Sequence, residues 1–504
     1  LRGSQSTLYG SDAIGGVIHI TTKKGSPVTE VAVSAQGGSF ETFVEQVEVR
    51  TGAQGGEVSL GFSREDSGSF SAADKRVGNS EEDRYERTSF SFQGGIHPFN
   101  ELDLNVVFRH NDSEADIDNF GGTGGDDPNR VFDNRETFFR TEGVVRLFDG
   151  ALKQIYGVAL TNHNFQDDND PDIAHPLDIQ RSEYSGKLIK WDLQNIYTHS
   201  PATRFIFGLE TEQETASSNF FSDGAFGPYS SNFGPADART NGYYADLFLE
   251  ASPWLASSFG VRLDDHSRTG NEVTFRIAPV VTIAESGTRF LGAVSTGYKS
   301  PSLFQLYSSY GNPLLEAEES TSWEVGVEQD LFDEVLTIGG TYFRNDIDRL
   351  VTFNSGTFVF ENINKANIEG FEFFARANVV QGLDLSVDFT LLDTEDESTK
   401  ESLLRRAKSQ LSSSLHYTFF DQRASLQARV RYVGERDDQN YNVFPAQRVT
   451  LSGYTLLDLL ATYHVTEAIS LFARVENLFD KDYQEVFGYG TAGVAGYGGV
   501  KVKI

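Results

Sequence analysis

Apolar and polar side chains alternate residue by residue along most of this chain. In residues 423–432, RASLQARVRY, Ala424, Leu426 and Val430 fall on one face of an extended strand, whereas Arg429 and Arg431 fall on the other. Successive side chains of a β-strand point to opposite faces, so this segment has one apolar face and one charged face. Such a strand fits a sheet that separates lipid from water.

The same alternation recurs in 22 segments, which we predict to be strands. They lie near residues 28–38, 42–52, 55–66, 84–96, 101–112, 135–149, 151–165, 181–198, 202–217, 239–252, 255–266, 273–285, 288–299, 321–332, 334–351, 360–380, 382–395, 405–420, 423–436, 448–465, 467–479 and 491–504.

The connections between these segments alternate between short and long. Short ones include residues 149–150 and 252–254, and long ones include residues 65–84, 111–134, 165–181 and 217–239. Tight turns at one rim and long loops at the other are typical of an outer-membrane barrel. A soluble propeller would also give many strands, but it needs a repeated blade sequence, which is not visible. We therefore predict an all-β fold, a 22-stranded antiparallel transmembrane β-barrel over residues 26–504.

Residues 1–25 differ from the rest of the chain. They contain one short apolar segment, Val17–Ile20, which we predict to be a strand, and they end at a hinge with Gly and Pro, Lys23–Pro27. A wide barrel of this size has a lumen that can hold a plug. We interpret residues 1–25 as the C-terminal end of a plug domain.

The composition excludes several classes of protein. With 73 acidic and 42 basic residues the net charge is −31, which argues against nucleic acid as a partner, because phosphate binding requires clustered Lys and Arg. The absence of Cys rules out disulfides, thiolate metal sites and a Cys nucleophile. The sequence contains no run of about 20 apolar residues, so it predicts no membrane-spanning helix. The absence of Met indicates that the natural N-terminus lies outside this sequence.

Four motifs occur in order along the chain. They are RGSQSTLYGSDAIGGVIHI (residues 2–20), GYKSPSLFQL (297–306), NINKANIEGF (362–371) and ENLFDKDY (476–483). Together they resemble the motifs of TonB-dependent outer-membrane receptors, the first being similar to the closing motif of the plug. Ser4, His19 and the final Ile504 depart from the usual pattern, and most of a plug, with its TonB contact, is missing.

The resemblance implies a monomer in the bacterial outer membrane, in contact with lipid and lipopolysaccharide. It implies the uptake of a scarce, large nutrient powered by TonB, with no enzymatic activity and no catalytic residues. A passive porin-like channel is the alternative from another class, and the plug-like residues 1–25 speak against it. The compact acid–His group Asp264-Asp265-His266 is the strongest sign of an enzyme, and it lacks a nucleophile.

Three further segments are similar to the cobalamin (vitamin B12) receptor subgroup. They are YSSYGNP (residues 307–313), LLRRAK (403–408) and YQEVFGYGTAG (483–493). Cobalamin is therefore the predicted cargo and small-molecule partner. A siderophore or haem receptor of the same fold is the alternative, although His163 and His175, the His residues in or near predicted loops, match no haem motif of the family.

The two long loops near residues 66–83 and 112–133 are rich in acidic residues. Alternate carboxylates such as Asp112, Glu114, Asp116 and Asp118 can face one cation, and Ca²⁺ takes six to eight oxygens from flexible loops. The cobalamin receptors order these loops with calcium, and the resemblance implies a structural calcium site at Asp74, Asn79, Glu81, Asp83, Asp118 and Asp133. The alternative is a solvated acidic loop. For the acidic run 167–172 we favour the solvated loop.

The resemblance also implies three ligand contacts, namely Arg405, Tyr441 and Asn241. Arg offers several hydrogen-bond donors to amides or phosphate, and Tyr offers a rigid ring with a hydroxyl group. The alternative for Arg405 is a structural ion pair with an acidic side chain.

Overall fold

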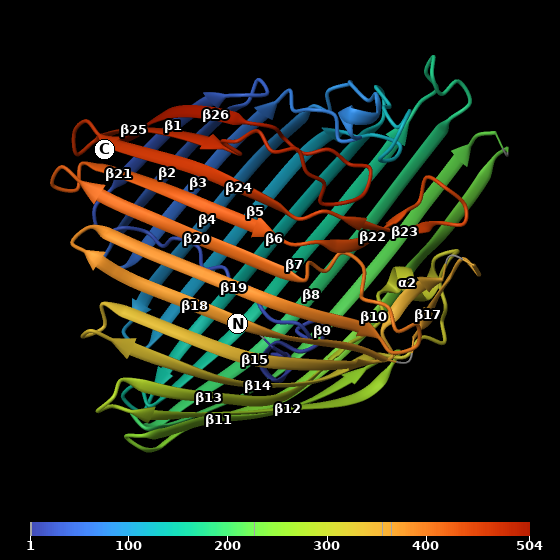
Figure 1. The fold of residues 1–504 in the computed structure, drawn as a ribbon. Helices are drawn as coiled ribbons and strands as arrows, with labels where there is room; N and C mark the ends of the chain where they lie inside the picture. Colours follow the sequence, from blue (N-terminus) through green and yellow to red (C-terminus); the bar gives the residue numbers. More distant parts are fainter. Residues whose placement is uncertain (1–2, 226, 355, 364) are drawn as a thin grey trace.

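The chain closes into one barrel in the computed structural model, which describes residues 3–225, 227–354, 356–363 and 365–504 (Figure 1). Its main sheet has 22 strands, and each described pair of neighbours is antiparallel. The first strand, β1, pairs with the last strand, β26, so the sheet has no free edge. The predicted 22-stranded antiparallel barrel is confirmed.

The barrel strands are β1 (Glu30–Gly38), β2 (Phe43–Ala53), β3 (Gly56–Ser67), β4 (Tyr85–Phe99), β5 (Leu102–Asp116), β6 (Val131–Leu147), β7 (Leu152–Asn169), β8 (Ile179–Ser200), β9 (Thr203–Asp223), β10 (Tyr229–Ser252), β11 (Leu255–His266), β12 (Gly270–Ile283), β13 (Thr288–Lys299), β14 (Glu318–Leu331), β15 (Leu336–Asp348), β18 (Lys365–Val380), β19 (Leu383–Asp396), β20 (Ser409–Phe419), β21 (Ala424–Val433), β24 (Tyr454–His464), β25 (Ile469–Glu476) and β26 (Ala495–Lys503).

Strand β11 shows how the alternation divides the wall into two faces. Phe259, Val261 and Leu263 are exposed on the outside, where lipid surrounds the barrel, while Arg262 and Asp264 between them are buried. The guanidinium of Arg262 makes a bidentate ion pair with Asp264, with both N···O distances at 2.7 Å. The first carboxylate of the acid–His group at residues 264–266 is therefore held in an ion pair by a wall residue.

The two rims differ in the way the sequence predicts. One rim has tight turns, such as residues 54–55 and 201–202, and the other carries the long loops (Figure 1). The loops contain a 3₁₀ helix, η1 (Lys75–Val77), the short helix α2 (Leu303–Tyr307), and the hairpins β16 (Val351–Asn354)–β17 (Val359–Asn362) and β22 (Arg436–Asn440)–β23 (Gln447–Leu451). In the described part of the chain, no helix is long and apolar enough to cross a membrane.

Two predicted loops are shorter than expected, because the strands on either side extend into them. The predictions at residues 165–181 and 217–239 are wrong in extent, because β7 runs to Asn169, β8 starts at Ile179, and β9 and β10 stay paired up to Ser222 and Tyr229. Strands β8 and β10 have 22 and 24 residues, whereas about 9–11 cross a membrane. The additional residues lack the alternation of apolar and polar side chains that predicts a strand in lipid, yet their backbones continue to pair.

Four predicted strands are wrong at their loop ends. The segment 448–465 is divided at residues 452–453 into β23 and β24, because β23 pairs with β22 while β24 pairs with β21. The segments 334–351 and 360–380 likewise each include part of the β16–β17 hairpin, and β20 begins at Ser409 rather than at residue 405. Alternation alone does not distinguish a barrel strand from a hairpin that stands above it.

Residues 3–25 pack against the barrel wall through the single-turn helix α1 (Ser6–Tyr9), which contacts β10, β11, β12 and β13. Ser4 Oγ donates to the carbonyl of Thr296 at 2.9 Å. Gly10 has φ +79° and lies so close to Arg262 that a Cβ atom there would be 2.8 Å from Nη2. The predicted strand Val17–Ile20 is wrong: the structure has no strand at these residues, and Ile18 and Ile20 are exposed.

Candidate functional site

Three carboxylates from two long loops meet above the barrel wall. Glu81 and Asp83 lie at the end of the β3–β4 loop, and Asp118 follows β5; one oxygen of each lies within 4.8 Å of the others. Asp83 and Asp118 are both 7% exposed. The approach of these loops therefore concentrates negative charge in a place that water hardly reaches.

Backbone amides hold this carboxylate cluster in place. The amides of Ala72 and Ala73 donate to Asp83 and Asp118, respectively. Asp126, on the β5–β6 loop, accepts hydrogen bonds from the amides of Ser80 (2.7 Å) and Glu81 (3.2 Å). The loops are thus fixed around the cluster by main-chain donors as well as by their side chains.

Two oxygens of the cluster are buried without a hydrogen-bond donor among the described residues. They are Oε2 of Glu81 and Oδ1 of Asp83. Burial, reinforced by neighbouring carboxylates, raises the pKa of Glu81 to about 7 and the pKa of Asp83 to about 7. Burial raises the pKa of Asp118 as well. Orphaned buried oxygens with raised pKa values fit a divalent cation bound by oxygens, such as Ca²⁺.

The other three predicted calcium ligands occupy different positions. Asp74 caps η1, pairs with Arg76 at 2.6 Å and accepts a hydrogen bond from Gln484. Asn79 is 2% exposed and donates to the carbonyl of Gly122 at 2.6 Å, so it ties the two loops together. Asp133 lies within β6, paired across the sheet with Glu114, and is outside the cluster.

A second group of charged residues surrounds a cavity of about 490 Å³ further along the same rim. Arg405 lines this cavity together with Arg431, Arg436, Tyr454 and Glu485. Arg436 is 4% exposed, donates to the carbonyl of Glu485 at 3.2 Å, and lies over the ring of Tyr454, 5.6 Å from its centroid. Asp388 also lines the cavity, so three guanidinium groups face two carboxylates and the wall keeps a small excess of positive charge.

Arg405 lies in the loop before β20, with φ +59°. Its Nε atom donates to Asp438 at 2.8 Å, and Asp438 is fully buried. Burial raises the pKa of Asp438, but hydrogen bonds from Arg405 and the amide of Phe487 outweigh it and hold the pKa below its usual value. The ion pair that we weighed as the alternative for Arg405 is therefore present, and it joins the loop to the β22–β23 hairpin.

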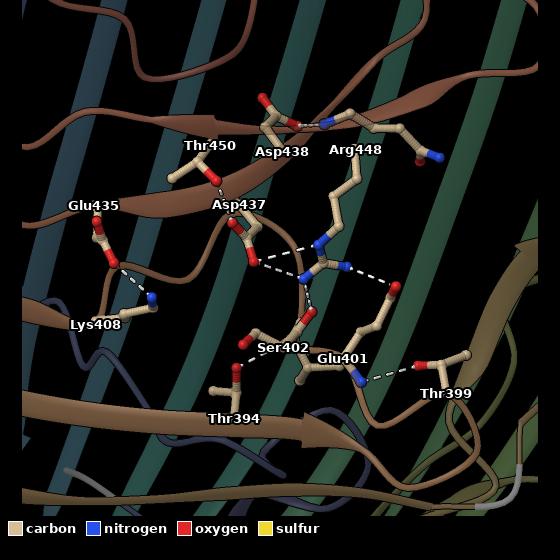
Figure 2. Close-up of polar contacts among 12 residues, drawn as sticks. Thr394, Thr399, Glu401, Ser402, Lys408, Glu435, Asp437, Asp438, Arg448 and Thr450 are labelled. Carbon is tan, nitrogen blue, oxygen red and sulfur yellow. Dashed lines mark hydrogen bonds and ion pairs between the residues drawn. The ribbon is translucent and has the colours of Figure 1, made fainter.

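A network next to this pair fastens the loop further (Figure 2). Arg448 on β23 donates to Asp437 at 2.8 Å and to the carbonyl of Ser402 at 2.6 Å, and it pairs with Glu401 at 3.0 Å. Lys408 pairs with Glu435. Side chains of Arg448 on β23 and of Glu435 just before β22 thus attach residues 397–408 to the hairpin region.

The two remaining predicted ligand contacts lie apart from each other. Tyr441 follows β22 and is 63% exposed at the loop rim. Asn241 lies within β10 and accepts a hydrogen bond from Thr211 at 3.0 Å. Arg405 and Tyr441 belong to the loops around β22, whereas Asn241 belongs to a distant part of the wall.

Comparison with known proteins gives the family. Residues 39–478 match the family described as "TonB dependent receptor-like, beta-barrel". The chain belongs to this family. As a TonB-dependent receptor it lies in the bacterial outer membrane, and its family consists of transport receptors rather than enzymes. Such receptors interact with TonB and bind small-molecule nutrients.

Solved structures match this receptor over its whole length. All of the chain superposes on the ferric yersiniabactin uptake receptor FyuA from Yersinia pestis, with TM-score 0.82, 16% identity and 84% of that chain covered. The ferripyoverdine receptor of the outer membrane of Pseudomonas aeruginosa gives TM-score 0.81, 14% identity and 75% coverage. The copper transporter OprC gives 0.81, 16% and 85%, again with all of this chain covered. At these identities the likeness establishes the fold.

Sequence reasoning did not select several residues that the receptor's loops bring together. Asp126 and Asp127 follow the glycine-rich part of the β5–β6 loop, and Asp172 and His175 lie in the β7–β8 loop. The acidic run 167–172, which we interpreted as solvated, supplies half-buried Asp172. A local signal existed in the Asp-x-x-His spacing of residues 172–175, but its partner is more than forty residues away along the chain.

Proposed function

We propose that this receptor actively imports a large, metal-containing organic nutrient across the outer membrane, with cobalamin as the first candidate. The observation that carries cobalamin is the cluster of Glu81, Asp83 and Asp118, which lies in the loops where the cobalamin receptors hold calcium. A cation there would neutralise the cluster and fix the β3–β4 and β5–β6 loops as part of the binding surface.

The cavity beside Arg405 is the proposed second wall of the binding site. The ion pair to Asp438 engages Nε of Arg405, and the side chain remains 45% exposed. Its outer nitrogens can therefore donate to the amides or phosphate of a ligand. Tyr441 at the same rim adds an exposed ring on which an apolar face can stack.

Transport in this proposal is a conformational process without covalent chemistry. The nutrient binds at the loop rim, and TonB, acting on the plug from the opposite side, opens a path through the lumen. Residues 3–25 would remain anchored to the wall through α1 and the contacts of Ser4 and Gly10 described above.

A ferric siderophore is the second candidate cargo. The observation in its favour is the cavity lined by Arg405, Arg431 and Arg436, where guanidinium groups outnumber carboxylates, which suits an anionic chelate. FyuA and the ferripyoverdine receptor, which share the fold, are receptors for such chelates.

Equilibrium binding to the receptor with its complete plug, purified in detergent, tests both candidates. Cyanocobalamin and a panel of ferric chelates would each be titrated in calcium and in EDTA. Saturable cobalamin binding that weakens in EDTA supports the first proposal, and binding of a ferric chelate alone supports the second. Arg405→Gln should weaken binding of the true cargo. Arg423→Gln, at the opposite rim, is the matched control. Failure of cyanocobalamin and of every ferric chelate to bind would contradict both.

A further inference from the structure

A second group of possible metal ligands lies next to the carboxylate cluster, on different residues. Asp127 comes from the β5–β6 loop, and Asp172 and His175 come from the β7–β8 loop; one ligand atom of each lies within 4.8 Å of the others. Unlike the first cluster, this one includes an imidazole. The two loops are separate in sequence, so their side chains meet only in the folded rim.

Asp127 is a fully buried carboxylate, with 0% exposure. Its Oδ2 atom accepts a hydrogen bond from the side-chain amide of Asn169 at 2.7 Å, but its Oδ1 atom has no donor among the described residues. The side-chain oxygen of Asn169, itself 3% exposed, is also without a donor. A buried carboxylate with half of its hydrogen-bonding capacity unused is costly unless a cation joins it.

A neighbouring arginine does not fill this gap. Arg130 makes a bidentate pair with Asp167, at 2.9 and 2.6 Å, and its remaining hydrogen bond goes to Asn119 at 3.0 Å. Its guanidinium is therefore committed to the neighbouring strand. The orphaned oxygens of Asp127 and Asn169 point to a ligand that the chain itself does not supply.

Asp172 holds His175 in a fixed orientation. Its Oδ1 atom accepts from the backbone amide of His175 at 2.6 Å, and its Oδ2 atom lies 3.1 Å from Nδ1 of the imidazole. A carboxylate that orients a histidine is the usual support of a protein metal ligand.

We propose that Asp127, the side-chain oxygen of Asn169 and the imidazole of His175 bind one divalent transition-metal ion of the Zn²⁺ type, with Asp172 as the carboxylate that orients the imidazole. Imidazole and carboxylate donors suit Zn²⁺ and its neighbours in the first transition series, whereas Ca²⁺ takes oxygens alone. Zn²⁺ lies about 2.0–2.2 Å from such donors, so binding draws the two loops together by about an ångström. The metal thereby fastens the β7–β8 loop to the loop that also carries the calcium-type cluster.

Zn²⁺ titration of the purified receptor by calorimetry, with Ca²⁺ saturating throughout, tests the proposal. We expect one saturable Zn²⁺ site. His175→Gln and Asp127→Asn should each weaken it by at least about tenfold, because even the loss of an outer-sphere partner costs about 10–100-fold. His163→Gln is the matched control, since His163 also lies beside a carboxylate, 3.7 Å from Glu136, but outside the cluster.

The variants also separate this site from its neighbour. Asp83→Asn should leave Zn²⁺ binding unchanged, because Asp83 belongs to the other cluster. His175 is only partly buried, so His175→Gln keeps the test valid if Asp127→Asn fails to fold. Equal Zn²⁺ affinity in the receptor and in His175→Gln, or the absence of saturable binding to the folded receptor, would overturn the proposal. Neither result bears on the proposed cargo.

Discussion

The backbone amide of Asp127 donates a hydrogen bond to Oδ1 of Asp118 at 3.2 Å. This single bond connects the two carboxylate groups of the rim, because Asp118 belongs to one and Asp127 to the other. Both residues lie in the β5–β6 loop, so this one loop supplies a carboxylate to each group.

Without a divalent cation, the β3–β4 loop should become less ordered as the pH rises. The pKa values of Glu81 and Asp83 are raised from 4.5 and 3.8 to about 7, so the folded loops bind protons more tightly than the unfolded chain. Their stabilising contribution is complete below the ordinary pKa values and is lost as the pH passes through about 7. Asp116, Asp118 and Asp126 add to the repulsion. Hydrogen exchange of residues 68–84 in EDTA, from pH 5 to pH 8, measures this loss.

Calcium should cancel that pH dependence, and the double variant Glu81→Gln, Asp83→Asn should flatten it without calcium. The prediction fails if exchange of this loop follows only the intrinsic chemical dependence on pH and the loop does not open further above pH 6. That result would show that these carboxyl groups are solvated in the metal-free receptor.

Asp83→Asn and Asp133→Asn should differ sharply in calcium affinity. Asp83 is buried within the cluster, whereas Asp133 lies in β6 outside it, although the family resemblance implies both as ligands. We expect Asp83→Asn to reduce the affinity at least about tenfold and Asp133→Asn to have little effect, because only the first removes a charged donor. Calcium titration by calorimetry compares the two. Equal losses would favour the family pattern over the observed geometry.

Asp438→Ala should loosen the loops around β22. The substitution leaves the amide of Phe487 and the guanidinium of Arg405 without their acceptor, which costs about 1–3 kcal/mol for buried groups. Hydrogen exchange of residues 434–453 and 477–494 should therefore accelerate. Glu435→Ala is the control, because its pair with Lys408 is about half exposed and such pairs contribute roughly 0–1 kcal/mol. Comparable acceleration in both variants would contradict the role assigned to Asp438.

Gly10→Ala should weaken the attachment of residues 3–25 to the wall. Gly10 has φ +79°, which costs an L-residue about 1–2 kcal/mol, and the new Cβ atom would meet Arg262, which Asp264 holds in place. Gly15→Ala is the matched control, since a Cβ atom there meets nothing within 4 Å. Limited proteolysis of the N-terminal segment reports the difference. Identical cleavage rates would mean that the segment is attached by other contacts.

The barrel was predictable because lipid and water impose opposite demands on alternate residues. Phe259 and Arg262 on β11 lie on opposite faces of the wall, as local patterning alone predicts. The β22–β23 hairpin was not predictable in this way. The residues around Val449 alternate as those of a barrel strand do, but Val449 pairs with Asp438 of the hairpin instead of with a barrel strand. Nor was the absence of a strand at Val17–Ile20 predictable, because a short apolar run does not show locally whether a sheet partner is available.

The candidate sites were predictable only where a family resemblance supplied the partners. Glu81, Asp83 and Asp118 meet as the resemblance implies, but Asp133 does not join them. Asp127 and His175 come together through the lengths of two neighbouring loops, which no spacing rule describes. For Arg405 the residue type was informative, while its ion pair with Asp438 depends on a hairpin that alternation conceals.

The long strands β8, β9 and β10 give the rim an uneven height (Figure 1). The 24 residues of β10 span about 80 Å, or about 55 Å upright at a typical tilt, roughly twice the thickness of the hydrocarbon layer. One side of the entrance is thus a tall hydrogen-bonded wall, against which α2 packs. An arriving molecule meets a fixed barrier on this side and can approach the binding surface only from the lower side of the rim.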